Sequence, residues 1–307
     1  MLSSTSTSTT NPVESSSFRV TSKKPQNVEV KADGQNIVFG DVKHPYRIPV
    51  IKDKLKQREW MLNEMAGAFR IFGRAGFNEG SAGHISVRDP VDPDTFWINP
   101  LAVHFSLLRP EDMVHVDKNG TYIGGNRTTI NRAGFRIHSA IHEARPDVNC
   151  ACHVHSVAGK AFSALGRPLD ILNQDACFFY NNQSLYSSFG GVVLDNVEGV
   201  EIAKALGPTN RTIILQNHGL LTCGSNVGEA CYLMTIMEKS CDIQLRIDAV
   251  QASGKYNRIL IGDDEARFTY EMVGDPSTLH SAFCSEYEYE VRLSNGELKS
   301  IAEFHED

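Results

Sequence analysis

The sequence predicts an α/β protein in which a mixed sheet is covered by helices. Apolar residues recur at three- and four-residue steps in two long segments, 53–75 and 225–253, as they do along amphipathic helices. Between these segments, short apolar strand patterns alternate with helical patterns, and several strands are joined by tight turns. Alternation combined with hairpin links is typical of a mixed sheet rather than of a doubly wound parallel sheet.

The first half of this pattern is a helix followed by short strands. The helix over 53–75 ends where Gly76 occupies a position typical of a helix C-terminus. Strands are expected at residues 84–88, 95–99, 113–116 and 121–123. The last two are linked through Lys118-Asn119-Gly120, an Asn-Gly turn signal that predicts a hairpin.

The second half alternates between helices and strands. Helices are expected at residues 131–144, 156–165, 198–206 and 225–253. Strands are expected at residues 149–155, 191–194, 212–216 and 220–223. Pro146 stops the first of these helices because its ring cannot continue one. The helix over 225–253, closed by Gly254, is expected to be the last regular element.

Composition narrows the functional classes. With 307 residues, 41% of them hydrophobic, the chain is long enough to bury a sizeable core. Lys and Arg number 30 against 37 Asp and Glu, a net charge of −7, which argues against nucleic acid as a partner. No apolar run approaches the roughly 20 residues that cross a bilayer, so no membrane span is expected. A small molecule remains the expected partner.

The N-terminal segment and the cysteines bear on the domain organisation and on the location of the protein. Residues 1–40 are rich in Ser and Thr and lack apolar periodicity, so a disordered arm is expected there, followed by one domain over 41–307. The first residues show no apolar signal-peptide core. The seven cysteines have no paired CxxC spacing and lie mostly in apolar runs, which predicts reduced, buried thiols. A cytoplasmic location is therefore expected.

Three histidines predict a metal site. His153 and His155 are two residues apart in an expected strand, so they share one face of the sheet. His218 follows another apolar strand and precedes a glycine, in a turn where functional groups are often displayed. Three neutral imidazoles suit zinc, iron, cobalt or nickel and leave positions open for substrate. The alternative is that these are ordinary, partly buried histidines.

Three separated motifs resemble the class II aldolase/adducin head-domain family. They are residues 80–89 (GSAGHISVRD), 139–156 (SAIHEARPDVNCACHVHS) and 216–220 (QNHGL). The resemblance implies an α/β/α three-layer sandwich, so the full expectation is such a sandwich around a mixed, largely antiparallel sheet. It also implies a homotetramer and one divalent ion, zinc first, with iron, cobalt or manganese as alternatives. The family's ligands map onto His153, His155 and His218.

Departures from the family pattern bear on the substrate. In the sugar-phosphate aldolases a glutamate upstream of the HxH pair moves the proton, and Gly134 stands at that position here. Residues of the phosphate-gripping loops also differ, namely His84, Leu101-Ala102 and Asn131-Arg132. These departures imply a non-phosphorylated substrate. The chain is similar to the adducin-like branch, yet it retains the three metal histidines that adducins lack.

Four further side chains are candidates for catalysis. His84 lies in a loop whose aldolase counterpart contacts substrate. His138 lies on the helix of the missing glutamate, one turn before His142. Asp175 and Tyr180 follow an apolar segment and are placed to reach a pocket. For each of them the alternative is a structural role, as a packed histidine or as a hydrogen bond that fixes a loop.

The expected function is that of a metal-dependent lyase. Such a site would chelate oxygen atoms of a hydroxy or keto compound and support retro-aldol cleavage or decarboxylation. The alternatives are an iron-dependent oxidative decarboxylase on the same fold and a non-catalytic, adducin-like interaction module. The identity of the bound metal and the consumption of oxygen distinguish between them.

Overall fold

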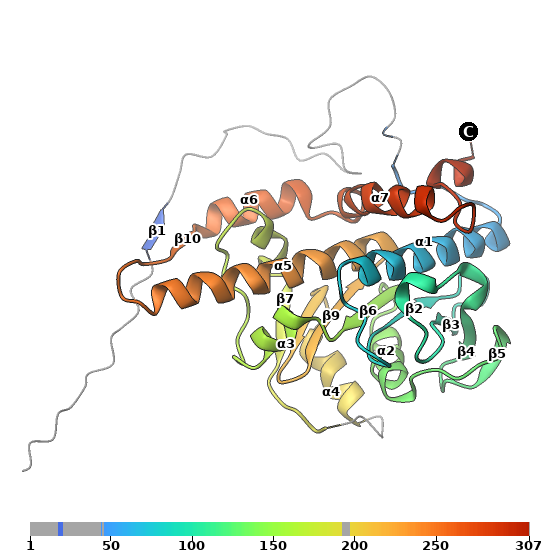
Figure 1. Ribbon diagram of the computed structural model, residues 1–307, viewed down its shortest axis with the longest axis horizontal. Helices are drawn as coiled ribbons and strands as arrows, with labels where there is room; N and C mark the ends of the chain where they lie inside the picture. Colours follow the sequence, from blue (N-terminus) through green and yellow to red (C-terminus); the bar gives the residue numbers. More distant parts are fainter. Residues whose placement is uncertain (1–17, 21–43, 45, 192–196, 307) are drawn as a thin grey trace, which may run out of the picture.

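The computed structural model describes residues 18–20, 44, 46–191 and 197–306, which fold around one eight-stranded sheet (Figure 1). Its strands lie in the order β5 (Tyr122–Gly125), β4 (Val114–Asp117), β3 (Thr95–Ile98), β2 (His84–Arg88), β6 (Cys150–Val154), β9 (Gly219–Gly224), β8 (Thr212–Leu215) and β7 (Gln183–Tyr186). Neighbours are antiparallel except β7 and β8, which are parallel. The mixed, largely antiparallel sheet is confirmed.

Helices cover both faces of the sheet, as the sandwich prediction requires (Figure 1). One face carries α1 (Lys54–Arg74), α3 (Val157–Ser163) and α5 (Val227–Gln251). The opposite face carries α2 (Arg132–Ala144) and α4 (Val197–Leu206). Beyond the first group, α7 (Pro276–Leu293) packs against both α1 and α5 and adds an outer helical layer, which α6 (Asp263–Val273) precedes.

Local sequence signals explain where α1 begins and ends. The Asp53 carboxylate accepts hydrogen bonds from the backbone N–H groups of Leu55 and Lys56, which have no partner inside the helix. After the last turn, Gly76 adopts a φ of 77°, a left-handed conformation that glycine enters without a Cβ clash. Both ends match the sequence prediction.

The register of three strands decides which residues meet at the site. In the pairing of β2 with β6, His84 is opposite His153. In the pairing of β6 with β9, His153 is opposite Leu221. The turn between β8 and β9 carries His218 and therefore lies at the same end of the sheet as the C-terminal end of β6. Residues far apart in the sequence are thus brought together by strand pairing alone.

Several elements differ from the sequence prediction. The helix over 225–253 is not the last element, because α6 and α7 follow it; Asp275 caps α7, with Pro276 in its first turn. Strand β7, with the polar sequence QSLY, was not expected, because an edge strand need not have a continuous apolar pattern. Most of the strand expected over 191–194 lies outside the described residues.

A short strand lies inside the expected N-terminal arm. Strand β1 (Phe18–Val20) pairs in parallel with β10 (Ile259–Ile261). The rest of the 1–40 segment lies outside the described residues. The division into an arm and one domain over 41–307 therefore stays a prediction.

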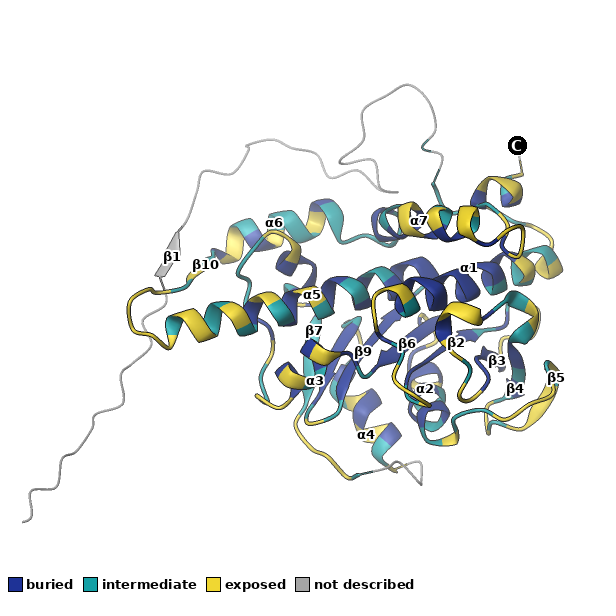
Figure 2. Ribbon diagram, viewed as in Figure 1, coloured by how far each residue is buried: buried dark blue, intermediate teal, exposed yellow. Residues whose placement is uncertain are grey.

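Burial follows the layers (Figure 2). One large apolar cluster fills the space between the sheet and the α1, α5 and α7 helices, and a smaller one lies between the sheet and α2 and α4. All seven cysteines are buried and free, as predicted. Among the described residues, no helix combines the length and apolar character needed to cross a membrane.

Candidate metal centre

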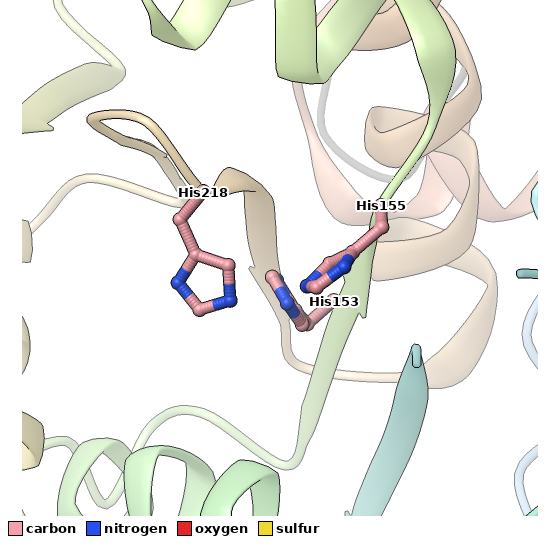
Figure 3. A group of neighbouring side chains, drawn as sticks. All are labelled: His153, His155 and His218. Atoms are coloured by element: carbon pink, nitrogen blue, oxygen red, sulfur yellow. The ribbon is translucent and has the colours of Figure 1, made fainter. Parts of the chain in front are cut away.

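The three predicted metal ligands converge (Figure 3). His153 lies in β6, His155 follows that strand, and His218 lies in the turn between β8 and β9. One ring nitrogen from each lies within 4.8 Å of the others. The ring centroids are 4.8 to 4.9 Å apart, and the rings are nearly perpendicular to one another. This spacing suits three imidazoles around one small cation.

A backbone contact orients the His153 ring, and a sharp turn of the chain precedes His218. The Nδ1 atom of His153 lies 2.8 Å from the Leu220 carbonyl oxygen, and because a carbonyl only accepts, Nδ1 carries the proton. The Nε2 atom of His153 is therefore free to bind a metal, the arrangement usual for metal-ligating histidines. Asn217 adopts a φ of 58°, which turns the chain sharply just before His218.

Burial keeps the three rings neutral. Desolvation lowers the pKa of His218 to about 4, with a further contribution from His155. Desolvation also lowers the pKa of His153 well below its ordinary value, and that of His155 to a smaller extent. Neutral imidazole is the form that binds metals, so no proton has to leave at neutral pH.

A cavity of about 450 Å³ opens onto these rings. Its wall includes His84, Gly134, Lys160, Phe189 and Asn217. Among the described lining residues, Lys160 is the only lysine or arginine, and its Nζ atom lies 2.6 Å from both carboxylate oxygens of Glu79. The Phe189 ring lies 6.3 Å from the His218 ring and is 53% exposed. The cavity thus has an apolar side and a cation that is already paired.

His84 is a fourth histidine at the base of this cavity. It is 3% exposed, its ring centroid lies 5.2 Å from that of His153, and neither ring nitrogen has a hydrogen-bond partner among the described residues. Desolvation lowers the pKa of His84 to about 3, helped by His155 and His218 and opposed by a backbone contact with Gly134. A neutral, buried imidazole in contact with the Gly134 backbone therefore adjoins the three candidate ligands.

Comparison with known proteins decides the family. A family described as the Class II Aldolase and Adducin N-terminal domain matches residues 63–245. The chain belongs to the class II aldolase and adducin family. It is 48% identical over 254 residues to the Meiotically up-regulated gene 14 protein of Schizosaccharomyces pombe, covering 83% of this chain and 98% of that protein.

Two further comparisons concern named activities. The chain is 40% identical over 208 residues to a 4-hydroxy-3-prenylphenylpyruvate oxygenase/4-hydroxy-3-prenylbenzoate synthase of Streptomyces roseochromogenus, covering 67% of this chain and 74% of that protein. The structure of the present chain resembles that of an L-fuculose 1-phosphate aldolase from Glaciozyma antarctica, with a TM-score of 0.75 and 37% sequence identity. The match covers 83% of this chain and 98% of the aldolase chain. Members of one family thus carry different named activities.

Within this aldolase and adducin fold, Gly134 and His84 form a steric pair. Gly134 lies in the first turn of α2, where its N–H donates to the side chain of Asn131, the N-cap residue. A Cβ atom added to Gly134 would lie 2.1 Å from Cε1 of His84 and 2.4 Å from its Nε2. The imidazole therefore occupies the space that a side chain at position 134 would enter. The absence of a side chain at position 134 and the buried position of the His84 ring therefore belong to one arrangement.

His138 and His142 lie behind His84 rather than at the cavity surface. As predicted, they share one face of α2, and both are buried. The Ser86 hydroxyl lies between them, 2.8 Å from Nδ1 of His138 and 2.8 Å from Nε2 of His142. The His138 and His84 ring centroids are 4.3 Å apart. Sequence reasoning did not identify Ser86, whose only signal is a serine inside a buried strand.

Asp175 and Tyr180 are not brought to this site. Asp175 begins the 3₁₀ turn Asp175–Phe179 and lines a different cavity, together with His44 and Tyr46. Tyr180 ends the turn and interacts with Arg267. Neither residue is among the described residues lining the metal-site cavity, because the turn packs against α5 and α6 instead.

Glu238 of α5 is a supporting residue that the sequence did not reveal. Its carboxylate accepts hydrogen bonds from the Ser156 hydroxyl and from the backbone N–H groups of Ala158 and Gly159, the latter two at 2.9 and 2.7 Å. These groups form the start of α3, directly after His155. Glu238 therefore fixes the backbone that carries one of the three candidate ligands.

Proposed function

We propose that this protein is a metal-dependent lyase acting on a non-phosphorylated hydroxy or keto compound. The observation that carries the proposal is the convergence of three neutral imidazoles on a cavity that also contains His84. His153, His155 and His218 would hold one divalent ion, zinc in first place, with iron, cobalt or manganese as alternatives. When bound, such an ion would polarise oxygen atoms of the substrate.

His84 is the residue proposed to exchange a proton with the substrate, because Gly134 has no side chain to do so. In a retro-aldol cleavage, neutral His84 takes the proton of a hydroxyl group while the adjacent carbon–carbon bond breaks. The electron pair of that bond passes to the departing carbon, to which His84 then returns the proton. In a decarboxylation, His84 would deliver a proton to the carbon that carbon dioxide leaves.

The cavity wall supports a substrate without a phosphate group. Phosphate recognition usually relies on unpaired cationic groups or on clustered backbone donors. Among the described lining residues, the single cation Lys160 is engaged by Glu79. Phe189, on the other hand, offers an exposed aromatic ring beside His218. A hydroxy or keto acid with an apolar part fits this wall better than a sugar phosphate.

Two other functions compete with this proposal. Iron-dependent oxidative decarboxylation is supported by the 40% identity to a protein named as an oxygenase. A non-catalytic, adducin-like module is the other alternative. The retained histidine cluster argues against it, because an interaction surface does not require three imidazoles that meet at one point.

We also propose that the protein is a cytoplasmic homotetramer. The buried free thiols suit a reducing compartment, and the tetramer rests on family membership. Light scattering tests the assembly directly: a particle of four chain masses is expected at micromolar concentration. A monomeric mass would refute the tetramer.

The function is tested by metal analysis combined with turnover. The purified protein is compared with the double variant His153→Ala/His155→Ala and with His104→Ala, which changes an exposed histidine outside the cavity. About one divalent ion per chain is expected at this centre in the unmodified protein and in His104→Ala, and none in the double variant. Each protein is then assayed on 2-hydroxy and 2-keto acids and on sugar phosphates, with oxygen consumption recorded.

Cleavage of a non-phosphorylated acid without oxygen uptake, lost in the double variant, is the expected result. Bound iron with oxygen consumption would favour the oxidative alternative. Preferred turnover of sugar phosphates would refute the substrate class. Absence of metal from the parent protein, even after reconstitution with zinc, would refute the metal-dependent reaction and favour the interaction module.

A further inference from the structure

A second group of side chains with metal-binding chemistry lies between α1 and α7. Glu64 belongs to α1, whereas His280 and Cys284 belong to α7, four residues apart and therefore on one face of that helix. A carboxylate oxygen, a ring nitrogen and the thiol sulfur of these residues all lie within 4.8 Å of one another. All three residues are buried, and none is among the described residues that line the cavity of the histidine centre.

The contact between Glu64 and His280 requires a positive centre. Nδ1 of His280 lies 3.3 Å from the carbonyl oxygen of Tyr46, and because a carbonyl only accepts, Nδ1 carries a proton. On the other side of the ring, Nε2 lies 2.7 Å from Oε1 of Glu64. Either a proton or a metal ion must lie between these two atoms, since their lone pairs would otherwise repel. A histidine held by a carbonyl at one nitrogen commonly binds a metal through the other.

Two observations favour a metal ion over a proton. Oε2 of Glu64 is buried and has no hydrogen-bond partner among the described residues. The sulfur atom of Cys284 lies 3.8 Å from Nε2 of His280. Sulfur and nitrogen ligands of one tetrahedral zinc ion lie about 3.6 Å apart. A shared proton would use neither the second oxygen nor the sulfur, whereas a zinc ion would take both oxygens, Nε2 and the sulfur as four donors.

The charges of this group balance around a divalent ion. Among the described residues, Glu64 forms an ion pair with His280 alone. Burial raises the pKa of the Cys284 thiol, with further contributions from Glu64 and Glu288, so the thiol keeps its proton until a cation binds. Zinc binding would release that proton to solvent, because a coordinating thiol is deprotonated. One divalent ion then neutralises one carboxylate and one thiolate inside the protein.

A neighbouring cavity provides a route for the ion. It has a volume of about 510 Å³, and its lining includes Tyr46, whose carbonyl contacts His280, and Leu279 and Ser281, which flank His280 in α7. Seating the ion requires the Glu64 carboxylate to move back from Nε2 by about 0.7 Å, to the separation of oxygen and nitrogen ligands on zinc. Rotation of the Glu64 side chain is sufficient for a shift of this size.

We propose that Glu64, His280 and Cys284 form a second, structural zinc site that fastens the outer helix α7 to α1. This inference goes beyond the proposed function and does not rest on it, because four protein donors leave no position open for a substrate. A set of thiolate, imidazole and carboxylate ligands suits zinc, whereas magnesium and calcium prefer oxygen ligands alone. The site would add one ion per chain to the ion held at the histidine centre.

Cobalt(II) substitution of the full-length protein tests this site separately from the histidine centre. A cobalt ion with a thiolate ligand gives an intense sulfur-to-metal charge-transfer band, which a site of three histidines cannot produce. After removal of bound metal with a chelator, titration with cobalt is expected to give this band at about one thiolate-bound ion per chain. The band should be equally strong in His153→Ala/His155→Ala. Its absence from the parent protein at saturating cobalt would refute the second site.

Cys284→Ala and Cys241→Ala form a matched pair, because each removes one buried, free thiol and only the first removes a proposed ligand. The band should disappear in Cys284→Ala and remain in Cys241→Ala, with circular dichroism confirming that both variants fold. A band that survives in Cys284→Ala would show that another cysteine binds the metal and would overturn the proposal.

Glu64→Gln supplies a test that preserves side-chain volume and an acceptor for His280. It should bind cobalt at least about 10-fold more weakly than the parent protein, because the loss of an outer contact to a ligand already weakens metal binding by about 10–100-fold. Unchanged affinity would mean that Glu64 and His280 form an ordinary hydrogen-bonded pair. None of these readouts involves turnover, so failure of the lyase assay and failure of the second site are separate results.

Discussion

A side chain at position 134 would overlap the His84 imidazole unless that ring moves. The ideal Cβ position of residue 134 is 2.1 Å from Cε1 of His84, far inside the contact distance of two carbon atoms. Glycine at 134 is therefore what permits a histidine at 84 to reach the base of the cavity. The imidazole from β2 and the absence of a side chain at position 134 of α2 must therefore be considered together when a mechanism is assigned.

The first prediction concerns Gly134→Ala. In a helix, this substitution ordinarily stabilises a protein by about 0.5–1 kcal/mol. Here the new methyl group must displace the buried His84 ring, so we expect a net decrease in the free energy of unfolding of about 1–3 kcal/mol. Urea denaturation measures this change. Metal content should be retained, because the three atoms nearest to the new methyl group belong to His84 and not to a candidate ligand.

Arg132→Ala is the control, since Arg132 is exposed in the same helical turn. It should change stability by less than about 0.5 kcal/mol. A Gly134→Ala variant that is more stable than the parent protein would mean that His84 does not occupy the position described.

The second prediction concerns the pH dependence of stability through His142. Burial lowers its pKa from 6.5 to about 3, so below pH 6.5 the unfolded chain binds a proton that the folded chain does not. The contribution of this histidine is fully present above pH 6.5 and is lost as the pH falls towards 3. His142→Phe should therefore show a free energy of unfolding that falls less steeply with decreasing pH, by about 1.4 kcal/mol per pH unit. If the free energy of unfolding depended on pH in the same way in the parent protein and in His142→Phe, this prediction would be wrong.

Sequence reasoning reached the three candidate metal ligands, which the fold brings together, because their signals are local. An HxH pair in a strand fixes the relative direction of His153 and His155, and an apolar strand followed by His218-Gly219 predicts a displayed side chain. The helix starting after Asp53 and the strand of His84 were predicted for the same reason, since capping and periodicity are written in neighbouring residues.

The rest depends on packing between distant segments. Nothing local connects Ser86 with His138 and His142, because only the contact of β2 with α2 puts the hydroxyl between the two rings. Asp175 was a reasonable candidate by composition, yet its turn packs away from the cavity. Chemistry-bearing residues can thus be shortlisted from sequence, whereas their grouping requires the fold.

The last prediction concerns Glu238, whose carboxylate connects α5 to the backbone that follows His155. Removing it in Glu238→Ala leaves the Ser156 hydroxyl and two N–H groups without their acceptor, so the start of α3 should loosen and His155 with it. Because supporting contacts of this kind typically change metal affinity by 10–100-fold, we expect zinc to bind at least about 10-fold more weakly, measured by competition with a chromogenic chelator. Asp242→Ala, one turn further along α5, removes only a surface pair with Arg246 and should leave zinc affinity unchanged. Equal affinities for the two variants would show that His155 is held by the strand alone.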